Sequence, residues 1–216
     1  VSVADGSFIQ LTHENDEILS QVKTGKIEQR WITTVDNKKM HTWVVYPPDF
    51  DPAKKYPAVL FCLGGPQGTI SQGFSTRWNY KLMAAQGYIV ILPNRRGTTA
   101  FGQEWCDQIS GDYIGKNMQD YLVSVRAMKK EPYVGKVAAV GASYGGYSVY
   151  YLAGIHQNTF SAFIAHAGIF NQEQMYMMTE LQTRLLRSAI SFLFSTRMRM
   201  ASEVLFLMCI RIILWR

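Results

Sequence analysis

A serine within a glycine-rich turn has the setting that most favours chemistry in this chain. Ser143 lies in the run Gly141-Ala142-Ser143-Tyr144-Gly145, which fits the pattern Gly-x-Ser-x-Gly, between an apolar stretch and a helix-like stretch. In that context the pattern indicates a nucleophile elbow, a tight strand-to-helix turn that exposes the serine hydroxyl above a sheet. Gly141 and Gly145 are expected where the strand and the helix approach most closely, because side chains there would hold them apart. The helix N-terminus would add positive potential beneath the hydroxyl.

A serine that attacks a carbonyl group also needs hydrogen-bond donors for the oxyanion that forms. The backbone N–H of the residue after the nucleophile, Tyr144, is one expected donor, and a loop after an early strand supplies the other. Gly64-Gly65-Pro66 follows the first long apolar run of the chain, so Gly64 and Gly65 are the candidates for this second donor. A plain turn is the alternative for the loop. Leu63 has no polar side-chain atom, so the donor would be a backbone N–H.

Four continuous apolar runs predict the strands that position these residues. They cover residues 58–63, 87–92, 136–140 and 160–165. Runs without alternation indicate strands that are covered on both faces, as in a parallel sheet. Between them, helices are expected over residues 78–86, 120–130 and 145–156. This alternation is typical of an α/β fold, in which ligands bind beyond the carboxyl ends of the strands.

An N-terminal β-hairpin is expected before these runs. Residues 28–35 and 40–46 are rich in β-branched and aromatic side chains, and a turn-forming stretch joins them. Residues 8–12 alternate between apolar and polar side chains, so we expect a strand that belongs to something upstream. His13 and His41 precede the domain core and are expected at its surface or on the side of the upstream part of the chain.

The composition is that of a globular domain. Of the 216 residues, 48% are hydrophobic and 18% are charged, which excludes a disordered tail, a collagen-like fibre and a disulfide-dense mini-protein. No apolar run reaches the roughly 18 residues that would predict a transmembrane helix. The first residues look like the interior of a longer chain and not like a targeting signal. Cys62, Cys106 and Cys209 are far apart, so neither a disulfide framework nor a zinc site is predicted.

The net charge of +6 is concentrated in the segment 181–216. It holds six of the 22 basic residues and one of the 16 acidic residues, which leaves 16 basic and 15 acidic residues in the body. This nearly neutral body argues against a nucleic-acid partner. The segment also lacks Gly, Pro, Asp and Asn, although the elements of a domain need turn residues between them. It is interpreted as a basic helix packed on the body, as an amphipathic membrane-surface segment, or as a stretch that is not the native continuation, which the abrupt change favours.

Three motifs together resemble the prolyl oligopeptidase family of serine peptidases. They are Gly-Ala-Ser-Tyr-Gly-Gly-Tyr at 141–147, Gly-Gly-Pro at 64–66 and Pro-Asn-Arg-Arg-Gly-Thr-Thr-Ala-Phe-Gly at 93–102. The likeness is greatest to the dipeptidyl-peptidase and acylaminoacyl-peptidase branches. It implies an α/β-hydrolase fold with an incomplete, mostly parallel sheet and flanking helices over residues 23–180. Residues 1–22 would then be the end of an upstream β-propeller and a hinge.

The resemblance also implies roles for individual residues. Ser143 matches the nucleophile, and the N–H groups of Tyr144 and of Gly64 or Gly65 match the oxyanion donors. Arg96, in the loop 94–97, is expected to brace that loop and not to catalyse. The family cleaves short peptides through an acyl-enzyme without a metal or a cofactor. A peptide substrate and a periplasmic or cytosolic compartment are therefore expected.

The base and the acid that such a serine needs are missing from this pattern. After Ser143 the chain contains no aspartate, its only histidines are His156 and His166, and its only acids are Glu173, Glu180 and Glu203. His156 lies 13 residues along the chain, on the order of 20 Å away at a helical rise of ~1.5 Å per residue. His166 ends the next strand. It therefore lies at the edge of the sheet where the active site is expected, but not in the strand from which the family's base comes. We therefore expect the chain alone to be inactive.

Two other functions stay open at this point. An esterase or another acyl hydrolase of the same fold would share the elbow, but the loop 94–102 and the propeller-like N-terminal residues favour a peptidase. A non-catalytic protein would instead use the basic segment 181–216 to bind a membrane or an acidic partner.

Overall fold

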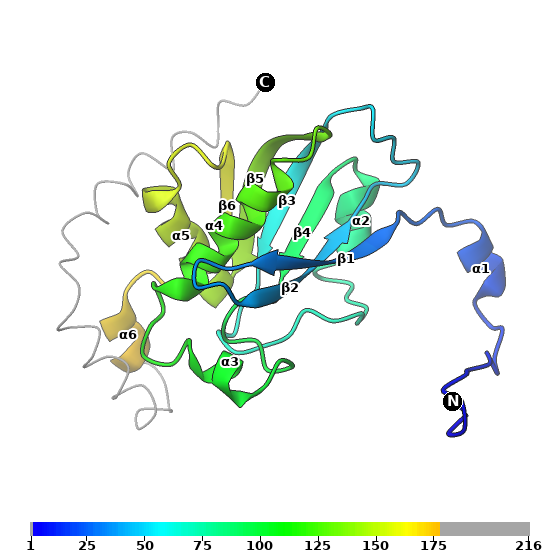
Figure 1. The fold of residues 1–216 in the computed structure, drawn as a ribbon, viewed down its shortest axis with the longest axis horizontal. Coiled ribbons are helices and arrows are strands. Elements are labelled where there is room, and N and C mark those ends of the chain that lie inside the picture. The colour runs from blue at the N-terminus through cyan, green and yellow to red at the C-terminus, as the bar shows by residue number, and fades with distance from the viewer. Residues whose placement is uncertain (1, 178–216) are drawn as a thin grey trace.

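The computed structural model describes residues 2–177, which form one mixed sheet with flanking helices (Figure 1). The strands are β1 (Ile27–Thr33), β2 (Lys39–Val45), β3 (Tyr56–Cys62), β4 (Ile89–Pro93), β5 (Val134–Ala142) and β6 (Ala162–His166). Their order in the sheet is β1-β2-β4-β3-β5-β6. β4, β3, β5 and β6 are parallel, and β1 and β2 form the antiparallel hairpin at one end. The predicted hairpin and the mostly parallel α/β sheet are confirmed.

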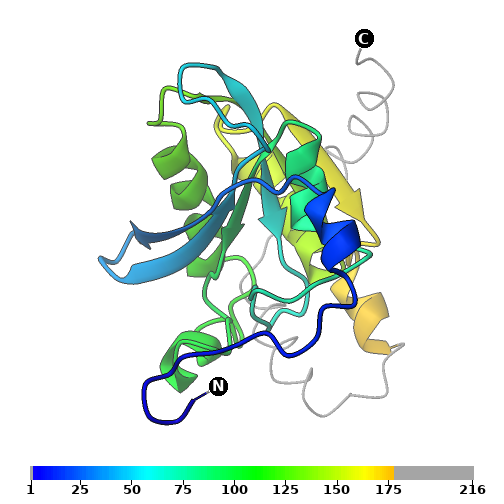
Figure 2. The same cartoon turned by 90° about the vertical axis from the view of Figure 1, so that its right-hand side faces the viewer.

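Helices cover both faces of this sheet (Figure 2). The helices are α1 (Asp16–Ser20), α2 (Tyr80–Ala85), α3 (Gln103–Asp107), α4 (Lys116–Met128), α5 (Tyr144–Ile155) and α6 (Gln172–Met177). Alternate residues of β4 serve the two faces, because successive strand side chains point in opposite directions. Ile89 and Ile91 pack in the core with α4 and α5, whereas Val90 and Leu92 pack in the core that contains α2.

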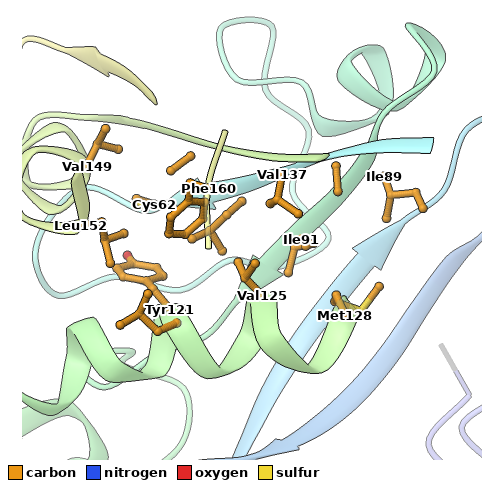
Figure 3. Close-up of a cluster of buried hydrophobic side chains, with 14 of the residues drawn as sticks. Cys62, Ile89, Ile91, Tyr121, Val125, Met128, Val137, Val149, Leu152 and Phe160 are labelled. Carbon is orange, nitrogen blue, oxygen red and sulfur yellow. The ribbon is translucent and has the colours of Figure 1, made fainter. Parts of the chain in front are cut away.

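The larger core lies between the sheet and the pair α4 and α5 (Figure 3). Tyr121, Val125 and Met128 of α4 are fully buried and recur at helical spacing on the face toward the sheet. Val149 and Leu152 of α5 continue this core. Full burial of such side chains contributes about 1.5–3 kcal/mol each, so this core holds α5, and with it the turn before α5, against the sheet.

One predicted helix was wrong in its extent, and one short helix was not predicted. α4 begins at Lys116 and not at Asp120, because polar residues of its first turns are buried and paired. Asn117, for example, donates from Nδ2 to the carbonyl of Tyr113. α3 was not predicted at all, since it spans only five residues and buries only Trp105 and Cys106.

The N-terminal residues 2–22 form no strand in this chain. Phe8, Ile9 and Leu11 are about four-fifths exposed, and Figure 1 shows α1 lying away from the sheet. The expected strand at 8–12 is therefore absent, and the assignment of 1–22 to a propeller and hinge stays a prediction. The basic segment 181–216, with its three interpretations, lies outside the described residues. None of the described helices is long and apolar enough to cross a membrane.

Candidate active site

Ser143 occupies the turn between β5 and α5 in a backbone conformation that is rare for a residue with a side chain. Its φ is 57° and its ψ is −124°, and such a conformation costs on the order of 1–3 kcal/mol. The turn is held on both sides: the Ser143 N–H donates to the carbonyl of His166 at 3.0 Å, and its carbonyl accepts from the Tyr147 N–H at 3.0 Å. The sheet and α5 together therefore fix the position of this serine.

Among the residues that the structure describes, the Ser143 hydroxyl has no hydrogen-bond partner. Ser143 is the N-cap of α5, where a serine oxygen normally accepts a hydrogen bond from the first helical turn. Here the side chain makes no capping bond, and the residue is exposed. A free, exposed hydroxyl at a helix N-terminus lies in positive potential, which favours negative charge developing beside it.

Gly141 and Gly145 lie where the backbones leave no room for a side chain. A Cβ built on Gly145 would lie 2.0 Å from the carbonyl oxygen of Cys62. A Cβ built on Gly141 would lie 2.5 Å from the carbonyl oxygen of Gly145. Both distances are far inside van der Waals contact, so a larger residue at either position would push α5 away from β3 and β5.

The Gly64-Gly65-Pro66 loop passes beside the serine. β3 ends at Cys62, which is paired with Gly141 of β5. A Cβ built on Gly64 would lie 3.7 Å from the Ser143 Cβ, so the loop backbone is in contact range of the turn. The N–H groups of Gly64, Gly65 and Tyr144 donate to no residue within the described part of the chain. Three unpaired donors thus lie in the two turns around an exposed hydroxyl.

Arg95, the first of two consecutive buried arginines, holds the loop beside Ser143 in place. Arg95 donates from its guanidinium to the carbonyls of Leu63 and Pro66, at 3.2 and 3.0 Å. It also donates to the Tyr121 hydroxyl at 2.8 Å, and its guanidinium lies 5.0 Å from the centre of the Tyr144 ring. Arg95 therefore ties the Gly64-Gly65-Pro66 loop to α4 and α5.

Arg96 points into a different network. Its guanidinium forms ion pairs with Asp36, in the turn of the hairpin, and with Asp120 of α4, and it lies over the Trp105 ring at 5.3 Å. Its backbone N–H donates to Asp120 at 3.0 Å. Arg96 is thus structural, as expected, and it joins the loop 94–97 to the hairpin and to α4.

The pKa values of the two acids in this network are shifted in opposite directions. Burial raises the pKa of Asp120 to about 6, although the Arg96 N–H and guanidinium act to lower it. The pKa of Asp36 is held well below its ordinary value, above all by the Thr34 hydroxyl and then by Arg96. Asp36 therefore carries the negative charge opposite Arg96, while Asp120 is close to neutral in mildly acidic solution.

Comparison with known proteins identifies the family. Residues 74–190 match the family described as the prolyl oligopeptidase family. The chain belongs to the prolyl oligopeptidase family. Dipeptidyl-peptidase 5 of Porphyromonas gingivalis is 59% identical over 83% of this chain and 27% of its own length. Dipeptidyl-peptidase 5 of Porphyromonas endodontalis is 53% identical over 83% of this chain and 26% of its own length.

The solved structures agree with this assignment. An acylaminoacyl peptidase in complex with Z-Gly-Gly-Phe-chloromethyl ketone superposes with a TM-score of 0.74 at 25% identity, over 83% of this chain and 29% of that chain. The predicted resemblance to the prolyl oligopeptidase family and the α/β-hydrolase fold are confirmed. The chain spans about a quarter of the length of the curated relatives that it matches.

The two histidines that follow Ser143 in this prolyl oligopeptidase family member have other side-chain partners than the serine hydroxyl. His156 caps the far end of α5, where its Nδ1 accepts from the Phe160 N–H at 3.4 Å. His166 ends β6 and approaches the Trp78 ring, with 6.4 Å between the ring centres. Within residues 2–177, no histidine or carboxylate bonds to the Ser143 hydroxyl. The same residues also contain no cluster of three or more His, Cys, Asp or Glu side chains that could hold a metal ion.

A surface position for His41, one of the two predicted alternatives, is wrong. His13 is exposed as expected, but His41 is only 5% exposed and its Nδ1 lies 3.0 Å from the Asn94 amide nitrogen. It is enclosed by aromatic rings of the hairpin and of the loop 94–102, including Trp43 and Phe101. Burial lowers the pKa of His41. This histidine helps to hold the hairpin against β4.

Arg95 is the residue of this site that sequence reasoning missed. A pair of arginines directly after a buried strand is a usable signal, because buried arginines need several acceptors. The pattern does not say which arginine faces the Gly64-Gly65-Pro66 loop.

Proposed function

We propose that this chain carries the nucleophile of a serine peptidase, and that Ser143 is that nucleophile. One observation carries the proposal: an exposed, uncapped serine hydroxyl sits at a strained strand-to-helix turn, near the N–H groups of Gly64, Gly65 and Tyr144, which are unpaired within residues 2–177. Membership of the prolyl oligopeptidase family supports the same chemistry.

The reaction follows from this arrangement. The Ser143 Oγ attacks the carbonyl carbon of a peptide bond, and a general base takes the hydroxyl proton. The carbonyl oxygen becomes an oxyanion that accepts hydrogen bonds from the Tyr144 N–H and from the N–H of Gly64 or Gly65. The carbon–nitrogen bond then breaks as the leaving amine receives the proton, and water hydrolyses the acyl-enzyme. Gly141 and Gly145 let β5 and α5 approach closely enough to hold this turn.

The substrate that we propose is a short peptide from which a dipeptide is released. Two relatives of this chain are named dipeptidyl-peptidase 5, and the sequence of the loop 93–102 supports a peptidase. We also propose that the 216-residue chain alone does not turn over substrate, because no imidazole in residues 2–177 bonds to the Ser143 hydroxyl and no aspartate follows Ser143 in the sequence.

A chimera tests the proposal in a complete enzyme. The aligned residues of this chain replace their counterparts in Porphyromonas gingivalis dipeptidyl-peptidase 5, and hydrolysis of dipeptide 4-nitroanilides is followed by absorbance. Ser143→Ala is expected to lower kcat by about 10³-fold or more, because the nucleophile is lost while binding remains. Ser161→Ala, at another exposed serine, is the matched control and should keep kcat.

Two results would refute the proposal. The first is a folded chimera that hydrolyses these substrates equally well with Ser143→Ala. The second is a folded, unsubstituted chimera without any hydrolysis. For the 216-residue chain alone, hydrolysis that Ser143→Ala abolishes would contradict the claim that this chain is inactive.

A further inference from the structure

We propose that Arg95 is a positioning residue that orients the oxyanion donors of the Gly64-Gly65-Pro66 loop. This inference rests on the proposed function, since it assigns a role within the same site. Arg95 is 1% exposed and does not reach the surface, so it acts through the loop and not by touching substrate.

The contacts of Arg95 enclose the two candidate donors. Its guanidinium donates to the carbonyl of Leu63 and to the carbonyl of Pro66. The N–H groups of Gly64 and Gly65 lie between these two carbonyls along the chain. Glycine backbones adopt many conformations, and Gly65 has a φ of 122°. The loop therefore needs an external clamp to keep its N–H groups aimed at one point.

Peptide planarity transmits this clamp to the donor. The Leu63 carbonyl and the Gly64 N–H belong to one planar peptide unit and point in opposite directions. A hydrogen bond that holds this carbonyl toward Arg95 therefore holds the Gly64 N–H away from it. Gly64 is also the loop residue in contact range of Ser143. A charged donor on the carbonyl further polarises the peptide unit and strengthens its N–H as a donor.

The positive charge of Arg95 is a second feature of the clamp. None of the carboxylates in residues 2–177 forms an ion pair with it. Its guanidinium is held instead by carbonyls, by the Tyr121 hydroxyl and by the ring of Tyr144. An unneutralised cation in a low-dielectric core attracts negative charge that develops nearby. Arg96, by contrast, is neutralised by Asp36.

The test compares Arg95 and Arg96 in the chimera described above. Arg95→Met and Arg95→Lys are made, with Arg96→Lys as the matched buried control. Active sites are counted by titration with a fluorophosphonate, so that poorly folded molecules do not enter kcat. Affinity for a dipeptide boronic acid, which forms a tetrahedral adduct with an oxyanion-like oxygen, is measured beside product inhibition by the dipeptide.

A positioning role predicts a selective loss. Arg95→Met should lower kcat per titrated site by about 10²-fold, which is the scale of one lost oxyanion donor. KM and dipeptide inhibition should stay within about threefold, because only the transition state uses the donors. Boronate affinity should fall by the same factor as kcat. Arg95→Lys should lose about tenfold, since Lys keeps the charge but not the fork. Arg96→Lys should lower the titrated fraction while kcat per site stays unchanged.

The inference is overturned if the Arg95 variants keep kcat and boronate affinity per titrated site, as a merely structural residue would. If Arg95→Met yields no titratable sites, Arg95→Lys decides. Failure of the proposed function is recognised separately, because the unsubstituted chimera would then show no hydrolysis that depends on Ser143.

Discussion

Two consecutive arginines stabilise two different regions of this molecule, and they do so through different kinds of interaction. Arg95 serves the serine region, where it is held by neutral groups: the Leu63 and Pro66 carbonyls and the Tyr121 hydroxyl. Arg96 serves the hairpin region, where it is held by the acids Asp36 and Asp120. The difference shows that buried Arg95 holds the backbone of the Gly64-Gly65-Pro66 loop, while buried Arg96 holds the hairpin. We expect changes at Arg95 to act on rate and changes at Arg96 to act on stability.

The largest expected effect on stability comes from removing the guanidinium of Arg96, which holds the hairpin region. Arg96→Met in the 216-residue chain leaves the buried Asp120 without its ion pair and leaves Asp36 with Lys116 as its remaining cation, which should lower the free energy of unfolding by about 3–5 kcal/mol. Arg95→Met leaves carbonyls without a donor but no unpaired charge, and should cost about 1–3 kcal/mol. Urea denaturation followed by circular dichroism measures both values. An equal or larger loss for Arg95→Met would contradict the distinction between the two regions.

A smaller effect is a pH dependence of stability that comes from Asp120, in the network of Arg96. Because the folded-state pKa of Asp120 is raised to about 6, the folded protein binds a proton between pH 4 and 6 that the unfolded chain releases. Stability should therefore fall as the pH rises through this window, by about 2–3 kcal/mol from this residue. Asp120→Asn should remove this fall, and Asp107→Asn, at an exposed acid, should keep it. A difference between wild type and Asp120→Asn that does not change with pH would contradict the assignment.

The smallest expected effect concerns the stability of the turn at Ser143. Because Ser143 has a positive φ, Ser143→Gly should be more stable than Ser143→Ala by about 1 kcal/mol, since glycine adopts this conformation freely. Thermal denaturation of the two inactive variants gives the difference directly. Ala at this position equal to Gly would mean that the turn is not strained.

The sequence allowed the sheet to be predicted because its signals are local. Buried parallel strands are continuous apolar runs, and the elbow around Ser143 is marked by glycines on either side of it. The hairpin was equally evident, since a turn-forming stretch separates β1 from β2. In each case the residues that define the element are neighbours in the chain.

What the sequence did not allow depends on contacts between distant residues. Arg95 and Arg96 are identical in type and adjacent, and only the fold shows that one faces Leu63 and the other faces Asp36. The start of α4 was misplaced because Asn117 and Asp120 are polar yet buried, each with partners far away in sequence. His41 was expected at the surface, because nothing near it in the sequence announces Asn94 as its partner.

The most direct measurement of the central claim is a crystal structure of the chimera with a dipeptide boronic acid. The account predicts that boron is bonded to the Ser143 Oγ. One boronate oxygen should then accept hydrogen bonds from the Tyr144 N–H and from the N–H of Gly64 or Gly65. Boron bonded to another residue, or a Ser143 adduct whose oxygens reach none of these N–H groups, would contradict it.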